Sequence, residues 1–275
     1  MNVVWDPVTY LQYDHERGRS FDELIARVHV DAPMTVVDLG CGPGGRTAAL
    51  LERWPMARVV GVDSSVEMVE AAQRHVVDGR LSFVTADLRE WEPVCPVDVL
   101  VANATLQWVP DHLELLPRLV DWLAPDGWLA FQVPGNFAEP SHRLLQEMRE
   151  SSRWRGRVGV GASGRSAVHQ PAAYLAVLAG LGLDVDAWET TYLHVLSGDD
   201  AVLEWTKGTA LRPVLMKLDQ AEREEFFAEY GALLRSAYPQ QECGTLFPFR
   251  RIFIVAHLPR PAGGVSTRAR DAVGG

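Results

Sequence analysis

Short apolar strands alternate with amphipathic helices along the first half of the chain, and this alternation limits the possible folds more than any other feature. The expected strands lie at residues 35–38, 58–62, 81–85, 97–101 and 127–133. The expected helices between them lie at 46–54, 65–76 and 112–123. Parallel strands need crossovers, and helical crossovers cover the faces of the sheet. The pattern therefore predicts an α/β fold built on an open, mostly parallel sheet with helices on both faces.

The second half of the chain follows a different pattern. After an initial helix at 9–28 and the alternating half, further helices are expected at 140–152, 171–181, 199–208 and 219–237, with strands at 183–195 and 249–257. We expect a single domain over 1–258, with a core at 31–134 and helical cap insertions at about 136–182 and 197–240. Segment 259–275 has few apolar residues, so we expect a disordered tail.

Charge and cysteine usage disfavour several classes of function. The 275 residues carry a formal net charge of −10, which argues against a nucleic-acid partner because such binding depends on neutralising phosphates. No apolar run is as long as a membrane span and no secretory signal is visible, so we expect a cytoplasmic protein without a membrane partner. Cys41, Cys95 and Cys243 are scattered, with no histidine at ligand spacing, so no metal site is expected.

One cationic run interrupts this acidic sequence. It reads Arg153-Trp-Arg-Gly-Arg157, and Arg165 follows within the same Gly- and Ser-rich segment, 153–170. Two interpretations stay open at this point: a solvated loop, or a lid that meets an anionic ligand.

A glycine-rich turn, Asp38-Leu-Gly-Cys-Gly-Pro-Gly44, lies directly between the first strand and the following helix. Glycines allow a tight turn and let a ligand approach main-chain N–H groups. Gly40, Gly42 and Gly45 also satisfy G-x-G-x-x-G, and Asp63 lies at the distance where dinucleotide-binding proteins hold a ribose. The turn alone therefore fits two cofactors, a nicotinamide dinucleotide and S-adenosylmethionine.

Three further features favour S-adenosylmethionine. Asp38 places a carboxylate where a dinucleotide's pyrophosphate would arrive, whereas a cationic amino-acid group tolerates or uses it. Asp87 follows the third strand and can accept a hydrogen bond from an adenine amino group. The fourth strand ends in the polar and aromatic loop 103–111, at the sheet edge where open α/β folds bind ligands.

These residues resemble the class I S-adenosylmethionine-dependent methyltransferases over about 35–133, most specifically in the D-x-G-x-G-x-G form of the glycine turn. The resemblance implies a Rossmann-like fold with a seven-stranded, mostly parallel sheet whose last strand, 249–257, runs antiparallel. It implies that Asp63 holds the ribose, Asp87 holds the adenine, and Asn103 contacts the amino group through its main chain. The full set of cofactor positions that it implies is Asp38, Gly40, Gly42, Gly44, Asp63, Ser64, Met68, Ala86, Asp87, Leu88, Asn103 and Gln107.

A closer resemblance, to the trans-aconitate 2-methyltransferase family, extends over nearly the whole chain. It rests on long strings, which are Trp5 to Leu11, Ala102 to His112, Glu139 to His142, Trp188 to Tyr192, Gly208 to Pro213 and Phe247 to Val255. The chain departs from the family's pattern in segment 153–169 and after Pro259. Because segment 153–169 is where a different acid could be selected, the substrate is less firmly indicated than the cofactor.

The resemblance implies that S-adenosylmethionine methylates a carboxylate of trans-aconitate, or of a related di- or tricarboxylic acid, giving a monomethyl ester and S-adenosylhomocysteine. A carboxylate is ionised at neutral pH, so no general base is expected. Arginines should grip the carboxylates that do not react. Adjacent residues on a strand face opposite ways, so at most one of Arg250 and Arg251 lines the pocket. The candidate substrate residues are Tyr10, Trp108, His142, Tyr192, Arg212, Arg250 and Arg251.

Three alternatives stay open from the sequence. The first is a methyltransferase of the same fold acting on another oxygen or nitrogen, such as a phenol or an amine. The second is a nicotinamide-dependent oxidoreductase, and the third is a non-catalytic S-adenosylmethionine-binding module. The sequence fixes neither the acid, nor which carboxylate reacts, nor the oligomeric state.

Overall fold

A computed structural model describes residues 14–159 and 168–260. Its sheet has the strand order β3-β2-β1-β4-β5-β8-β6, and a short additional strand, β7, pairs with β8. β1 to β5 pair in parallel, whereas β8 runs antiparallel to both β5 and β6. The expected mostly parallel sheet with an antiparallel last strand is thereby confirmed. The strands are β1 (Thr35–Leu39), β2 (Arg58–Asp63), β3 (Leu81–Thr85), β4 (Val97–Asn103), β5 (Leu123–Pro134), β6 (Asp184–Leu196), β7 (Gln240–Gln241) and β8 (Gly244–His257).

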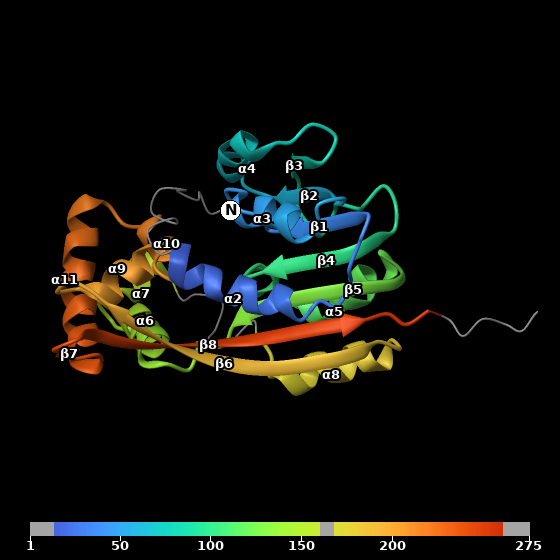
Figure 1. Cartoon of the computed structure of the whole chain (residues 1–275). Coiled ribbons are helices and arrows are strands. Elements are labelled where there is room, and N and C mark those ends of the chain that lie inside the picture. Colours follow the sequence, from blue (N-terminus) through green and yellow to red (C-terminus); the bar gives the residue numbers. More distant parts are fainter. Residues whose placement is uncertain (1–13, 160–167, 261–275) are drawn as a thin grey trace, which may run out of the picture.

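Helices cover both faces of this sheet (Figure 1). One apolar cluster joins α5 and α8 to the sheet, and a second joins α2, α3 and α4 to the opposite face. The helices and 3-10 turns are α2 (Asp14–Ala26), α3 (Gly45–Arg53), α4 (Val66–Ala72), η1 (Gln73–His75), η2 (Leu106–Trp108), α5 (His112–Asp121), α6 (Pro140–Glu150), α7 (Arg155–Val158), α8 (Pro171–Gly180), α9 (Ala201–Lys207), α10 (Arg212–Leu215) and α11 (Gln220–Ala237).

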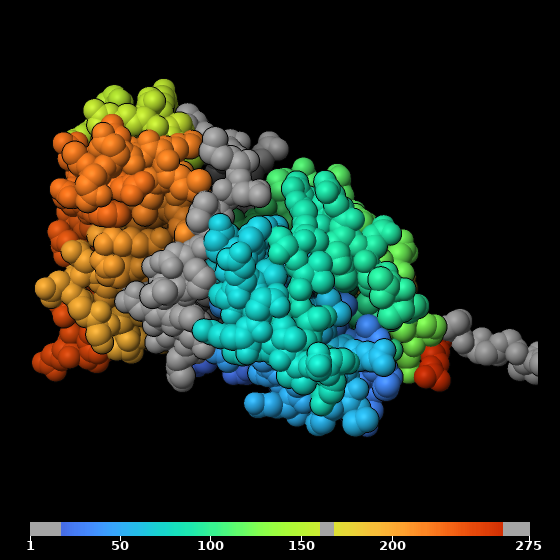
Figure 2. Space-filling view, turned by 90° about the horizontal axis from the view of Figure 1, so that it is seen from above, coloured from blue at the N-terminus to red at the C-terminus, as the bar shows by residue number. Residues whose placement is uncertain are grey.

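The remaining helices, α6, α7 and α9 to α11, form a cap with an apolar core of its own. β6 and β8 extend beyond the other strands and run into this cap, as Figure 1 shows. From above, the orange surface of the cap and the cyan and green surface of the core form two lobes (Figure 2). The carboxyl ends of β1 to β4 therefore face a region that the cap encloses.

Several boundaries differ from the sequence-based prediction. β8 begins at Gly244 and not at 249 as predicted, because its first half continues the pairing with β6 as far as Thr245 opposite Leu196. α7 is a short helix within the segment interpreted as a loop, and α10 is a short helix between two expected helices, where no element was predicted. α8 packs on the core sheet through Tyr174 and Leu178 and is not part of the cap. The predicted tail, apart from its first two residues, lies outside the described residues.

Candidate active site

A cavity of about 1260 Å³ lies between the carboxyl ends of the parallel strands and the cap. One wall comes from the connections that follow β1 to β4, and the facing wall comes from α6, α9 and β8. This is the edge at which open α/β sheets bind ligands. The position of the cavity thus agrees with the sequence-based expectation.

The glycine turn forms the floor of the cavity. Gly40 and Gly42 both have positive φ, at 73° and 54°, and both line the cavity. A side chain at Gly40 would meet the Thr105 hydroxyl at 2.1 Å, whereas a Cβ at Gly42 would meet nothing within 4 Å. Any larger residue at position 40 would clash with Thr105 and would adopt an unfavourable backbone conformation. The open space beside Gly42 leaves room for a ligand to lie against the main chain. Gly44, which has φ 81°, is not among the described residues that line the cavity.

Asp63 is attached to this turn by hydrogen bonds. It accepts hydrogen bonds from the main-chain N–H of Gly42 and of Ser65, each at 2.9 Å, and it lines the cavity. Burial raises the pKa of Asp63, and the main-chain donors partly oppose that rise. A carboxylate oxygen has two lone pairs, so Asp63 keeps acceptor capacity for ligand hydroxyls.

Asp38 lies behind the turn, buried and outside the cavity surface. The Thr47 hydroxyl donates to it at 2.6 Å. Burial raises the pKa of Asp38 to about 6, and the nearby Asp63 carboxylate adds to the rise. Asp38 therefore supports the turn from behind and does not line the cavity.

Asp87 lines the cavity after β3, beside Ala86 and Leu88. Arg89 also lines the cavity and donates to both carboxylate oxygens of Asp87, with Nε at 3.0 and 3.1 Å. These hydrogen bonds hold the pKa of Asp87 below its usual range. The cation was not foreseen from the sequence, and it keeps Asp87 ionised as an acceptor.

The loop after β4 contributes uncommon backbone geometry and unpaired polar atoms. Ala104 has φ 54°, a left-handed conformation that is rare for residues other than glycine. The Ala104 N–H donates to the main-chain carbonyl of Gln132, and the Ala104 carbonyl accepts from the side-chain amide of Gln107. Asn103 Oδ1 and Gln107 Oε1 are buried and have no hydrogen-bond partner in the described part of the chain. Buried acceptors of this kind are normally satisfied, so they indicate a ligand with donors.

Among the predicted arginines, the structure distinguishes Arg251 from Arg250. Arg251 is 5% exposed, lines the cavity from β8, and donates to Gln132 Oε1 at 3.4 Å. Its guanidinium carbon lies 4.4 Å from the centroid of the Phe249 ring. Arg250 faces the other way and bonds Glu189 and Gly135 outside the cavity. The expectation that at most one of the two lines the pocket is met, and the residue is Arg251.

Similar proteins identify the chain. Residues 13–187 match a family model described as a methyltransferase domain. A trans-aconitate 2-methyltransferase of Streptomyces avermitilis is 53% identical over 259 residues, covering 92% of this chain and 96% of the relative. One of Streptomyces coelicolor is 51% identical over 94% of this chain and 88% of the relative. The chain belongs to the trans-aconitate 2-methyltransferase family.

Solved structures agree with this family's fold. The plantazolicin methyltransferase BpumL in complex with SAH superposes with a TM-score of 0.51 at 14% identity, covering 92% of this chain and 88% of that one. Phosphoethanolamine N-methyltransferase 2 of Haemonchus contortus, in complex with S-adenosyl-L-methionine, gives 0.55 at 15% identity, covering 92% and 57%. At these identities the likeness shows the fold alone.

The remaining predicted residues divide into two groups. Ser64, Met68, Trp108 and His142 line the cavity. Burial lowers the pKa of His142 to about 4, so its ring is neutral at neutral pH. The other predicted residues are Arg212, Tyr192 and Tyr10.

Arg212 and Tyr192 are not among the described residues that line the cavity. The string around Arg212 reaches the cavity through Thr209 and Ala210. Tyr192 is buried and donates to Glu23 of α2, because β6 carries it beneath that helix. Tyr10 lies outside the described residues.

Sequence reasoning missed several lining residues of this family member. Asn136 follows β5, Arg149 lies near the end of α6, and Ser20 comes from α2. Helical periodicity could have found Arg149, because it lies two turns after His142 on the same helix. Asn136 carried no signal, since a lone asparagine in a loop reads as a turn residue. The remaining missed residues include Trp205, Phe247 and Phe249.

The cationic run before residue 160 is engaged in the structure. Arg153 pairs with Glu225 at 2.8 Å and also with Glu229, and Arg157 pairs with Glu222 at 3.4 Å, all on α11. These contacts favour a structural role over a lid for the two arginines. Arg165 lies outside the described residues.

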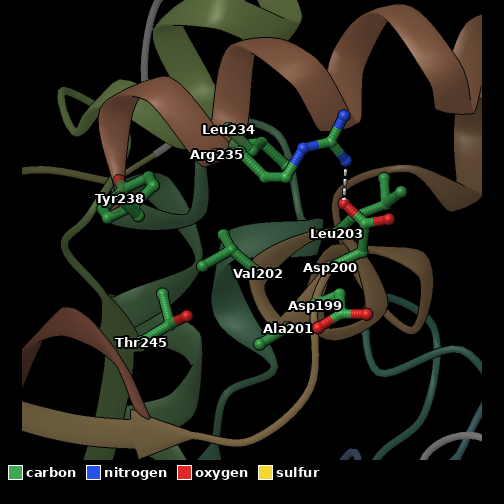
Figure 3. A pocket seen from close by; sticks show the side chains of 9 residues that line it. All are labelled: Asp199, Asp200, Ala201, Val202, Leu203, Leu234, Arg235, Tyr238 and Thr245. Carbon is green, nitrogen blue, oxygen red and sulfur yellow. Dashed lines mark hydrogen bonds and ion pairs between the residues drawn. The ribbon is translucent and has the colours of Figure 1, made fainter. Parts of the chain in front are cut away.

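A second hollow, between α9 and α11, is far smaller (Figure 3). Its volume is about 10 Å³, room for about one water molecule. Arg235 pairs with Asp200 across its rim. The hollow is a small packing gap between α9 and α11. Within residues 14–159 and 168–260, no cluster of His, Cys, Asp or Glu could hold a metal ion, and no helix is long and apolar enough to cross a membrane.

Proposed function

We propose that this protein transfers a methyl group from S-adenosylmethionine to a carboxylate of trans-aconitate, forming a monomethyl ester. The observation that carries the proposal is the buried Arg251, which faces the glycine turn and Asp63 across one cavity. An acidic protein that buries a guanidinium in its cavity has a site suited to an anionic substrate. The substrate named for the relatives carries three carboxylates.

The lining residues fit S-adenosylmethionine. The open space beside Gly42 admits a ligand against the main chain, and the unpaired oxygens of Asn103 and Gln107 await donors. Asp63 would hold the ribose hydroxyls, Asp87 would accept from the adenine amino group, and the loop after β4 would hold the amino group. When bound, the cofactor supplies an electrophilic methyl group on a positively charged sulfur.

The protein's residues have little proton chemistry to perform. The acid's carboxylate is already ionised near pH 7, so it can attack without a base. His142 is neutral and partly buried, and it provides a hydrogen bond or a packing surface for the acid. Catalysis therefore rests on aligning the carboxylate oxygen with the methyl group and on excluding water.

Arg251 would bind a carboxylate that does not react. A guanidinium held tightly against the attacking oxygens would reduce their nucleophilicity. Arg251 would therefore bind a neighbouring carboxylate and leave the reacting one without a guanidinium contact. Its contacts with Gln132 and the Phe249 ring fix the direction of the guanidinium before the acid arrives.

The test uses labelled S-adenosylmethionine, trans-aconitate and the full-length chain. We expect a labelled monomethyl ester, identified by mass spectrometry. Asp63→Ala should weaken S-adenosylhomocysteine binding by on the order of 10- to 100-fold, because it removes a charged acceptor and loosens the turn. Labelling of only a monocarboxylate, phenol or amine would refute the tricarboxylate proposal. Binding of NADH in place of S-adenosylhomocysteine would refute the methyltransferase itself.

A further inference from the structure

α6 forms one wall of the cavity, and its lining residues include Leu145 and the Arg143–Glu147 pair. His142, Gln146 and Arg149 all line it, at the spacing of residues that share one helix face. Seven residues separate His142 from Arg149, which places them about 10 Å apart along the helix axis. The wall therefore presents polar groups over a length greater than one carboxylate occupies.

Two side chains that line the cavity have polar atoms without partners in the described part of the chain. Arg149 Nε is buried and unbonded in the described part of the chain, and both amide atoms of Asn136 are likewise unbonded. Asn136 is only 1% exposed. Leaving a buried polar group unsatisfied destabilises the folded protein. Atoms of this kind that line a cavity are explained by a ligand that bonds them.

Arg149 brings a positive charge to this wall. No carboxylate of the described residues lies within ion-pair distance of its guanidinium, whereas Arg143 on the same helix has Glu147 at 3.8 Å. Desolvation lowers the pKa of Arg149, yet a guanidinium keeps its proton in proteins. The carboxylate of Glu150, the next residue, acts on this charge from beyond ion-pair distance, so Arg149 is a partly buried cation without a direct carboxylate contact among the described residues.

We propose that Arg149 forms a second carboxylate subsite, which receives a carboxylate of the acid that neither reacts nor binds Arg251. Arg149 and Arg251 come from different elements, α6 and β8, and line the same cavity. Arg89 and Arg143 also line the cavity, but each has a carboxylate partner in the protein. A tricarboxylate therefore supplies one group to react and one each for Arg149 and Arg251. A dicarboxylate leaves one arginine without its anion. The inference rests on the proposed function and extends it to how the acid is selected.

The subsite predicts selection by the number of carboxylates. The wild-type protein should use trans-aconitate with a higher kcat/KM than itaconate, mesaconate or glutaconate, each of which lacks one of its three carboxylates. A charge-assisted hydrogen bond contributes about 1.5–3 kcal/mol, which corresponds to roughly a 10- to 150-fold preference.

The decisive experiment measures kcat/KM for all four acids with Arg149→Gln. We expect a loss of about 10- to 100-fold for trans-aconitate and no change for the dicarboxylate that lacks the carboxylate bound by Arg149. Arg149→Lys keeps the charge and should recover part of the loss.

Controls separate the subsite from a general loss of structure. Arg250→Gln removes an arginine outside the cavity and should keep the wild-type order of acids. S-adenosylhomocysteine affinity should be unchanged in Arg149→Gln. An equal loss for all four acids, or no loss for any, would overturn the subsite and leave the proposed function intact. If the wild-type protein esterified none of the acids, the proposed function would fall and the subsite with it.

Discussion

Asp38 shows how strongly a single buried residue can respond to its surroundings. Its carboxyl group is completely buried behind the glycine turn, where burial raises its pKa from 3.8 to about 6. Between those two pH values the folded chain keeps a proton that the unfolded chain releases. The free energy of unfolding therefore falls as the pH rises through this interval, by up to about 3 kcal/mol for the full shift.

We expect Asp38→Asn to remove this dependence, because an amide has no proton to lose and its oxygen can still accept from Thr47. Relative to the wild type, the ligand-free variant should gain stability between pH 4 and 7. Thr47→Val should make the free energy of unfolding fall more steeply with pH. The hydroxyl's hydrogen bond lowers the pKa of Asp38, so its loss raises that pKa further. Urea unfolding at several pH values measures both effects. Identical pH slopes in the wild type and Asp38→Asn would show that Asp38 is ionised throughout.

Most residues predicted to bind the cofactor line the cavity, whereas fewer of those predicted to bind the acid do so. Gly40, Asp63, Asp87 and Asn103 follow consecutive strands, and parallel strands bring their carboxyl ends to one edge, so local pattern determines their position. Arg212 could not be placed, because its position depends on how the cap packs. Long-range packing of this kind leaves no local periodic signal.

At the scale of elements, α2 is fastened to the edge strand β6 through one carboxylate. Glu23 accepts hydrogen bonds from Trp188 Nε1 at 3.0 Å, from Thr190 at 2.8 Å and from Tyr192. Burial raises the pKa of Glu23, but these donors outweigh it and hold the pKa below its usual value. The three donors lie at alternate positions on one face of β6, which is why a single acceptor can serve all of them.

Glu23→Ala should destabilise the protein by about 2–4 kcal/mol, because it leaves three partly buried donors without their acceptor. It should also weaken acid binding, since Ser20 lines the cavity one turn earlier on α2. Denaturant unfolding and the KM for trans-aconitate test the two effects. Asp22→Ala is the matched control, because Asp22 is exposed and its nearest cation, Arg46, is 3.9 Å away. Equal effects of the two substitutions would contradict the role given to Glu23.

At the scale of the whole molecule, core and cap have separate apolar cores but share two strands. Phe247 and Phe249 of β8 belong to the cap cluster, whereas Ile252 and Phe253 of the same strand belong to the clusters on the sheet. β6 pairs with β8 without interruption from Asp184 to Leu196. Unfolding of the cap would therefore break the β6–β8 hydrogen bonds near the cap and destabilise the rest of this pairing at the edge of the sheet.

This continuity predicts that cap and core unfold together as one cooperative unit. Phe226 is fully buried in the cap, where its ring lies 5.0 Å from that of Trp154, so Phe226→Ala should cost about 3–5 kcal/mol. Hydrogen exchange of peptides from α9 and from β4 measures cap and core separately. In Phe226→Ala, we expect the opening free energy of the slowest-exchanging amides to fall by the same amount in α9 and in β4. Wild-type protection of β4 beside a loss confined to α9 would mean that the cap melts alone, and that β6 and β8 do not transmit its stability to the site.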